Sequence, residues 1–197
     1  ITMSEIKVNK ISPATGTDIT LGDSGDTLTV PSGGTIVNSG TATGFGGGKI
    51  GQVVQTLRTD TETTTSSSFV TMNFAVTITP TATDSKILLS ANFGSINPKY
   101  SGQFVHVKID GGNCATYIGD AALGYESAMT SIGTYDDYTQ QSCSLQYLDS
   151  PATTSATTYT LYWHQGGGTS AWLNRCGTLR AANGNTASTF VAMEVLA

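Results

Sequence analysis

Residues 69–93 read FVTMNFAVTITPTATDSKILLSANF, and this stretch predicts the fold class of the chain. Apolar residues alternate with small or polar ones in residues 70–78 and again in residues 87–93, as they do in a strand with one buried face. An amphipathic helix would instead need apolar residues three or four positions apart. Pro80 and Asp84 favour a turn between the two runs. We predict a long antiparallel hairpin that forms one wall of a β-sandwich. Its core face would comprise Val70, Met72, Phe74, Val76 and Ile78, then Ile87, Leu89, Ala91 and Phe93.

Similar patterns recur along the chain about every ten residues. Charged residues make up only 12% of the chain, against about 25% in typical domains, and the 33 threonines favour strands over helices. Residues 59–68 and Asp120–Gln141 lack alternation and are expected to be loops, whereas Val191, Met193 and Val195 should share one face of the last strand. Eight or so strands with turns between them predict an all-β sandwich or jelly roll. The further strands are expected at Gln52–Arg58, Gln103–Asp110, Cys143–Leu148, Thr158–His164, Ala171–Arg175 and Thr189–Leu196.

The first quarter of the chain has a different character. Eleven of the 23 glycines lie between Gly16 and Gly51, and three short apolar pieces, Ile19–Leu21, Leu28–Val30 and Ile36–Val37, are separated by turn-forming clusters. Each piece is too small to bury a core within one chain. The stretch is therefore either a disordered linker or a slender stem that pairs with copies of itself, and the regular recurrence favours a trimeric stem. We expect a stem with a glycine-rich neck over residues 1–48 and a head over residues 49–197.

Composition and motifs argue against several classes of function. A net charge of −5 with nine Lys and Arg residues is unlike the basic surface of a nucleic-acid-binding protein. No apolar run is long enough to span a bilayer, so we expect no membrane insertion. The glycines at 44–48 do not complete a phosphate-binding loop, and no closely spaced ligand pairs predict zinc, so no cofactor is expected. Cys114, Cys143 and Cys176 are expected to be free buried thiols, with one disulfide as the alternative.

Catalytic patterns are scarce. His106 and His164, the only histidines, each lie within a predicted strand, where a framework role is favoured over that of a general base. No GxSxG motif is present. Asp136 and Asp137, flanked by Tyr135 and Tyr138, offer carboxylates and rings for sugar binding, although an ordinary solvated loop is the favoured interpretation. We therefore expect a protein that is not an enzyme.

The wording of residues 4–48 resembles a segment near the start of fibre-like structural proteins of tailed bacteriophages, notably those of marine bacteria and cyanobacteria. The resemblance is most specific in Lys7-Val8-Asn9-Lys10-Ile11 and in residues 17–22, TDITLG. The remainder is more loosely similar to the trimeric jelly-roll heads of the tumour-necrosis-factor and complement type. The resemblance implies a homotrimeric virion fibre that is assembled in the host cytoplasm. Its stem would dock on tail or capsid proteins, and its head would touch a host-surface glycan or protein.

Two other functions stay open beside host attachment. One is an architectural capsid-decoration or tail-adaptor protein without receptor contact, and the less favoured one is a polysaccharide-degrading tailspike. If the head does bind a receptor, its loops are the expected place, because a rigid sandwich carries its variable chemistry there. The segment Asp120–Gln141 is the longest without alternation, although it would instead seal the trimer if it packs on a neighbouring protomer. Its candidate receptor-binding residues are Tyr125, Tyr135, Asp136, Asp137 and Tyr138.

Overall fold

A computed structural model of the chain divides into two units, Ile1–Phe45 and Gly46–Ala197, and each is described by itself. The structure describes residues 11–35, 37, 50–99, 103–114, 118–120, 127–133, 138–167, 170–178 and 184–196. Residues 1–10 and the glycine-rich neck of the predicted stem therefore lie outside the described residues.

Turns and extended backbone make up the described part of the N-terminal unit, and residues 11–35 form no strand. Gly22 adopts a positive φ of 81° where the Asp26 carboxylate accepts a hydrogen bond from the Asp23 amide. A Cβ at Gly22 would lie 2.9 Å from the Asp26 side chain, so glycine suits this turn. The described large apolar side chains of the predicted pieces are exposed, among them Leu21 and Leu28. Within a single chain the described residues of these pieces therefore form no core of their own.

The larger unit is all-β, with no α-helix among the residues that the structure describes. The alternating stretches found in the sequence supply most of its ten strands. The strands are β1 (Ile50–Arg58), β2 (Glu62–Thr64), β3 (Val70–Ile78), β4 (Lys86–Pro98), β5 (Phe104–Asp110), β6 (Thr130–Gly133), β7 (Gln141–Asp149), β8 (Thr157–Gly166), β9 (Ala171–Leu173) and β10 (Ser188–Val195).

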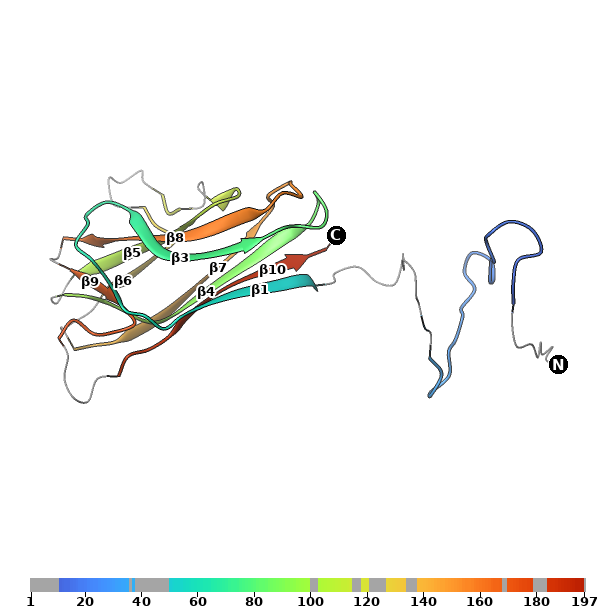
Figure 1. The fold of residues 1–197 in the computed structure, drawn as a ribbon, viewed down its shortest axis with the longest axis horizontal. Helices are drawn as coiled ribbons and strands as arrows, with labels where there is room; N and C mark the ends of the chain where they lie inside the picture. Colours follow the sequence, from blue (N-terminus) through green and yellow to red (C-terminus); the bar gives the residue numbers. More distant parts are fainter. Residues whose placement is uncertain are drawn as a thin grey trace. The chain divides into compact units, whose positions relative to one another are not determined.

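Two curled sheets face each other across a common core, an arrangement compatible with a β-sandwich. Sheet A has six strands in the order β1-β10-β4-β9-β2, and β7 also pairs with β4. Sheet B has four strands in the order β3-β8-β5-β6. Figure 1 shows β3 and β8 in one layer and β1 and β10 in the other. All the strand pairs are antiparallel, which suits sheets with one buried and one exposed face.

The predicted hairpin of residues 69–93 is wrong, because β3 and β4 lie in different sheets. β3 pairs with β8, and β4 pairs with β10, β7 and β9. Alternation shows which face of a strand is buried, but that face is the same whether the partner is the next strand in the chain or a distant one. The connection at residues 79–85 is long enough to cross the roughly 10 Å between packed sheets. It is held against sheet A by Glu194, whose carboxylate accepts hydrogen bonds from the Thr81 amide at 2.6 Å and hydroxyl at 2.8 Å.

The predicted core faces are largely confirmed. All the apolar residues predicted for the core face of β3 and β4 are buried except Val70, which is exposed at the start of β3. Val191, Met193 and Val195 share one face of β10 as predicted, and it is the outer face, where they are half-buried. Its inner face carries Phe190 and Ala192. Both faces of this strand are apolar enough that alternation alone could not choose between them.

Two predicted loops contain short strands. Residues 59–68 contain β2, which pairs with β9, and residues 120–141 contain β6, which pairs with β5. Both strands are short, and the sequence of β2 is purely polar. A pattern of two alternations is too brief to be recognised in a sequence, and partner strands decide the pairing instead.

Candidate functional site

The predicted receptor segment is described only in part. Tyr125, Tyr135, Asp136 and Asp137 lie outside the described residues. Tyr138 is described, directly before β7, and its side chain is 40% exposed. Its ring therefore offers contact area at the surface with a polar hydroxyl at the tip.

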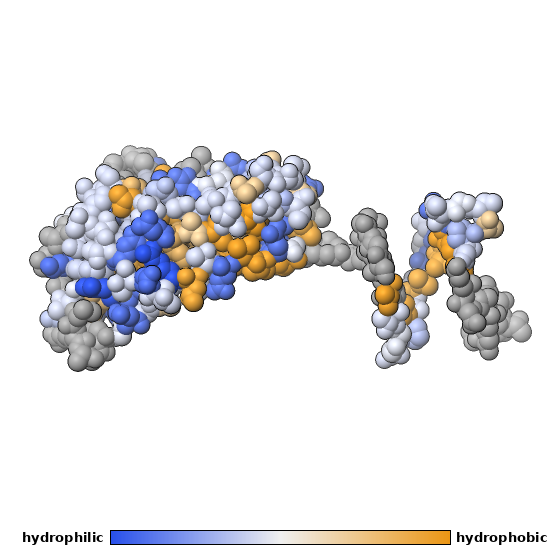
Figure 2. All heavy atoms as spheres, viewed as in Figure 1, coloured by the Kyte–Doolittle hydropathy of each residue, from blue (hydrophilic) through white to orange (hydrophobic). Residues whose placement is uncertain are grey.

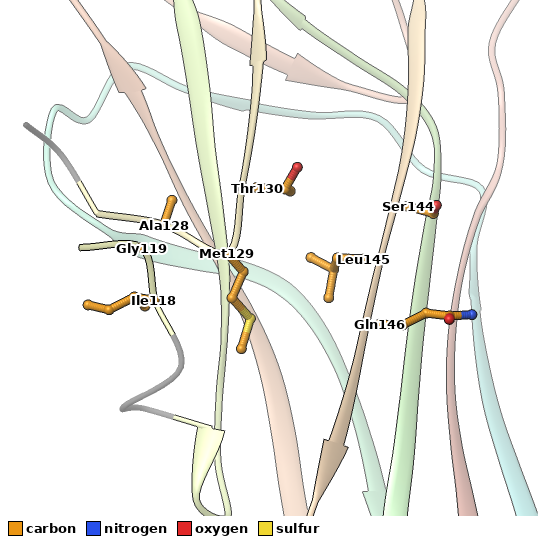
Figure 3. Close-up of a pocket in the computed structure, with 8 residues that line it drawn as sticks. All are labelled: Ile118, Gly119, Ala128, Met129, Thr130, Ser144, Leu145 and Gln146. Atoms are coloured by element: carbon orange, nitrogen blue, oxygen red, sulfur yellow. The ribbon is translucent and has the colours of Figure 1, made fainter.

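A pocket of about 590 Å³ lies next to this segment, between β6 and β7 (Figure 3). We call it the β6–β7 pocket. β6 is the edge strand of sheet B next to β5, and β7 lies beside β4 in sheet A. The pocket therefore lies at an edge of the sandwich, between one strand of each sheet. Its lining residues are Ile118, Gly119, Ala128, Met129, Thr130, Ser144, Leu145 and Gln146.

Backbone contacts hold one wall of the β6–β7 pocket in place. The Gly119 amide donates to the Ala128 carbonyl at 3.0 Å, and the Met129 amide donates to the Val107 carbonyl of β5 at 2.9 Å. The Met129 sulfur also accepts a hydrogen bond from the Ile109 amide at 3.1 Å. These contacts join Gly119 to Ala128 and attach the neighbouring Met129 to β5, so the wall is part of the sandwich.

The opposite wall follows from the alternation of β7. Leu145 is buried and points towards Met129, whereas Ser144 and Gln146 point to the other face of β7 (Figure 3). The floor of the pocket is therefore apolar, and none of its lining residues carries a charge. Such a pocket can bind a ligand or a protein side chain, but its lining supplies no acid or base for catalysis.

The cysteines of the chain do not form a reactive centre. All three are free, with Cys114 and Cys176 buried and Cys143 half-buried. Burial, aided by the charges of Asp149 and Asp110, raises the pKa of Cys114 to about 12. Burial alone raises the pKa of Cys143 to about 11. Both thiols therefore stay protonated near neutral pH, and the thiolate is the nucleophilic form.

Other titratable groups have structural surroundings. The Tyr159 hydroxyl donates to Asp149 at 2.6 Å inside the core, and burial followed by this hydrogen bond raises the pKa of Tyr159. Asp149 also accepts a hydrogen bond from the Asn113 amide at 3.1 Å, which fixes the turn after β5. Within the described part of the chain, no group of three or more His, Cys, Asp or Glu residues is placed to hold a metal ion.

The lining of the β6–β7 pocket was only partly accessible to sequence reasoning. Leu145 falls in a stretch whose alternation predicted a strand, so its inward direction could have been inferred. Ile118 and Met129 flank the segment without alternation, and no local pattern indicated that they lie together. The pairing of β6 with β5 decides their position.

The chain matches no protein-family model and no curated protein. A search of the described residues finds no helix that is long and apolar enough to cross a membrane. The fold and the surfaces described above are accordingly the basis for the functional proposal.

Proposed function

We propose that the chain is a homotrimeric, non-enzymatic virion fibre protein of a tailed bacteriophage, with an N-terminal stem that docks on the particle and a head that contacts the host surface. The strand order of the head carries this proposal. Numbered 1–8 along the chain, the eight longer strands are β1, β3, β4, β5, β6, β7, β8 and β10. Their hydrogen-bonded pairings place them in the orders 1-8-3-6 and 2-7-4-5. Two sheets connected in this way make a jelly roll, an architecture common in viral structural proteins and in lectins.

An apolar band across the outer face of sheet A supports the trimer. Val53 pairs with Met193, Met193 with Leu88, and Leu88 with Leu148, so four apolar side chains form one row across β1, β10, β4 and β7. Val53 and Leu148 are 57% and 46% exposed. Figure 2 shows hydrophobic residues gathered over β1 and β10. Contiguous exposed apolar surface of this kind marks an interaction site, and a second copy of the chain is the partner that closed symmetry supplies.

Exposed apolar residues in the stem support the same assembly. Ile19, Leu21, Leu28 and Val30 are between 40% and 69% exposed in the single chain. Removing these side chains from water needs partners outside the chain. Parallel copies around a symmetry axis would place the same apolar residues of each copy at the same level along that axis. The stem would then remain free at its N-terminal end to dock on tail or capsid proteins, and assembly in the host cytoplasm would place the protein in the virion.

Host contact is assigned to the segment Asp120–Gln141, which contains Tyr138 and also supplies Ala128, Met129 and Thr130 to the β6–β7 pocket. An exposed aromatic residue and an apolar, uncharged pocket suit binding and lack catalytic groups. The second candidate function is an architectural decoration or adaptor protein, which the same fold and apolar band would serve without any receptor. A polysaccharide-degrading tailspike is less favoured, because no pair of carboxylates lines the β6–β7 pocket.

Adsorption of the protein to host cells distinguishes the attachment function from the architectural function. Purified full-length chain should bind susceptible host cells and compete with intact particles for adsorption. The double variant Tyr135→Ala with Tyr138→Ala should lose this binding while its melting temperature and trimer content stay unchanged. Loss of melting temperature or trimer content first would show that the tyrosines seal the trimer. Absence of cell binding by the wild-type trimer, with the protein localised on the particle, would favour the architectural function.

A further inference from the structure

Four rings form a continuous row on the outer face of sheet B. His106 and His164 stack with their ring centroids 4.7 Å apart and 24° between planes. The edge of Phe69 meets His164 at 4.5 Å, and Phe104 lies 6.5 Å from His106. We call this row, Phe69–His164–His106–Phe104, the ring ladder.

The register of two strands builds the ring ladder. His106 of β5 pairs with His164 of β8, and Phe104 pairs with Gly166. Two glycines leave the space that the rings fill. A Cβ at Gly166 would lie 2.8 Å from His106 Nε2, and one at Gly133 would lie 2.8 Å from the Phe104 ring. Any other residue at either position would push a ring aside, so the sequence at these positions favours the ladder.

A pocket of about 480 Å³ lies against the ring ladder, within the size range of small-molecule sites. We call it the ring pocket. Phe104 is 49% exposed, so one face of an aromatic ring is accessible there. The lining residues are Ser67, Phe104, His106, Ser131, His164, Gln165, Gly166 and Gly167.

The ring pocket combines rings with neutral polar groups. Ser67 and Ser131 supply hydroxyls, and the imidazoles carry nitrogens that donate or accept according to the tautomer. Gln165 also lines the pocket, but it alternates with His164 along β8 and pairs with the buried Val105, so its side chain belongs to the inner face. The hydroxyls and the imidazole nitrogens are therefore the polar groups that a ligand with hydroxyls would contact.

Fixed charge is missing from the lining of the ring pocket. No Asp, Glu, Lys or Arg is among its residues. Lys108 lies on the same face outside the pocket lining, and its ammonium is 4.8 Å from the Phe69 ring centroid and 5.8 Å from that of Tyr162. A strongly anionic ligand would therefore lack a partner within the pocket, and a purely apolar ligand would leave its polar groups unsatisfied.

We propose that the ring pocket binds a neutral pyranose unit of a saccharide. The apolar C–H face of the sugar would stack on Phe104, and its hydroxyls would exchange hydrogen bonds with His106 and Ser131. A pyranose presents one apolar face and a rim of hydroxyls, which matches an aromatic wall bordered by neutral donors and acceptors. A role of this site in receptor capture rests on the proposed attachment function, whereas saccharide binding itself can be measured on the isolated protein.

A printed array of neutral oligosaccharides tests the proposal. The array should carry hexose, 6-deoxyhexose and N-acetylhexosamine units, with sialylated and sulfated counterparts. Full-length protein should bind neutral members. Phe104→Ala should weaken that binding at least tenfold, and Phe104→Tyr should retain it because the ring is kept. Phe104 is half-exposed, so an unchanged melting temperature should accompany the loss.

Tyr162→Ala is the matched control, since Tyr162 is an aromatic residue on the same outer face of sheet B but outside the ring pocket. Binding by this variant should equal that of the wild type. The proposal is overturned if no neutral saccharide binds, if sulfated members bind best, or if Tyr162→Ala rather than Phe104→Ala removes binding. Array binding by a protein that does not adsorb to cells would contradict the attachment function and leave the ring pocket in place. Cell adsorption unaffected by Phe104→Ala, together with unchanged array binding, would contradict the ring pocket alone.

Discussion

Phe74 packs between the two sheets, and its surroundings predict a large cost for its removal. It is 1% exposed, and its ring meets that of Phe190 edge to face at 6.0 Å, so β3 of sheet B contacts β10 of sheet A through this pair. Phe74→Ala should lower the free energy of unfolding by about 3–5 kcal/mol, because the lost burial and the remaining cavity both destabilise the fold. Urea denaturation at constant protein concentration measures the difference.

Thr77→Ala is the control on the opposite face of the same strand. Thr77 is exposed, and its hydroxyl lies 2.8 Å from that of Thr158. Its substitution should cost no more than about 1 kcal/mol, the usual net contribution of one hydrogen bond. Equal costs for the two variants would contradict the assignment of the outer face of sheet B to solvent.

Glu194 predicts a loss of stability in acid. Burial alone would raise the pKa of this carboxyl group, but hydrogen bonds from Gln52 and Thr81 outweigh it and lower the pKa to about 2. A pKa below its value in the unfolded chain, near 4.5, stabilises the fold above that pH. This contribution should disappear as the pH falls from about 4.5 to about 2. Since each pKa unit corresponds to about 1.4 kcal/mol, the full loss should be of the order of 3–4 kcal/mol.

Glu194→Gln provides the comparison for this pH dependence. The amide keeps an oxygen near Thr81 but does not titrate, so the acid limb of its stability curve should be flatter than that of the wild type. Urea denaturation at several pH values between 2 and 6 gives both curves. Parallel curves would mean that Glu194 contributes nothing to acid unfolding.

At the scale of the element, the separation of β3 from β4 predicts which strands can be cross-linked. Thr77 and Thr158 are Cα partners in sheet B, and directly opposed residues of an antiparallel pair lie within the span of a disulfide. Thr77→Cys with Thr158→Cys should therefore form a disulfide on mild oxidation. A fall of two in the number of titratable thiols in the denatured protein, relative to the unoxidised sample, measures the bond.

Thr77→Cys with Leu88→Cys tests the hairpin that the sequence predicted. A turn over residues 80–85 would place these two positions opposite each other, whereas in the structure they lie on the outer faces of different sheets. This second variant should keep both added thiols under the same oxidation. A disulfide in it, and none in the first, would restore the hairpin and contradict the sheet order.

For the whole molecule, the apolar band on sheet A predicts assembly. Val53→Asp with Leu148→Asp places two carboxylates on that band, and charge buried without a partner opposes association. The wild-type chain should sediment as a trimer, and the double variant should dissociate at concentrations at least tenfold higher than the wild type does. Analytical ultracentrifugation over a concentration series gives both values.

Thr77→Asp is the control for assembly, because it adds one carboxylate to an exposed position on the outer face of sheet B, away from the apolar band. It should leave the sedimentation of the trimer unchanged. A wild-type chain that is monomeric at roughly micromolar concentration would contradict the trimer. Equal dissociation of both variants would instead show that added negative charge, rather than the band, weakens the assembly.

The candidate sites were predictable only where a local pattern existed. Alternation in residues 103–110 separates Phe104 and His106 from Val105 and Val107, and the structure has Val105 and Val107 buried and the other two on the opposite face. Their pairing with His164 and Gly166 in β8 could not be inferred, because strand register depends on hydrogen-bond partners far along the chain. For the same reason the ring pocket, which needs β5, β6 and β8 side by side, left no signal in the sequence.

The sequence by itself determined the all-β class, the position of most strands and the buried face of β3, β4 and β5. These properties are local, since successive side chains of any strand point to opposite faces. Only the tertiary structure decided that β3 and β4 belong to different sheets and that the outer face of β10 carries Val191, Met193 and Val195. Those outcomes depend on which distant strands share hydrogen bonds and on contacts such as that of Glu194 with Thr81, and no local pattern encodes them.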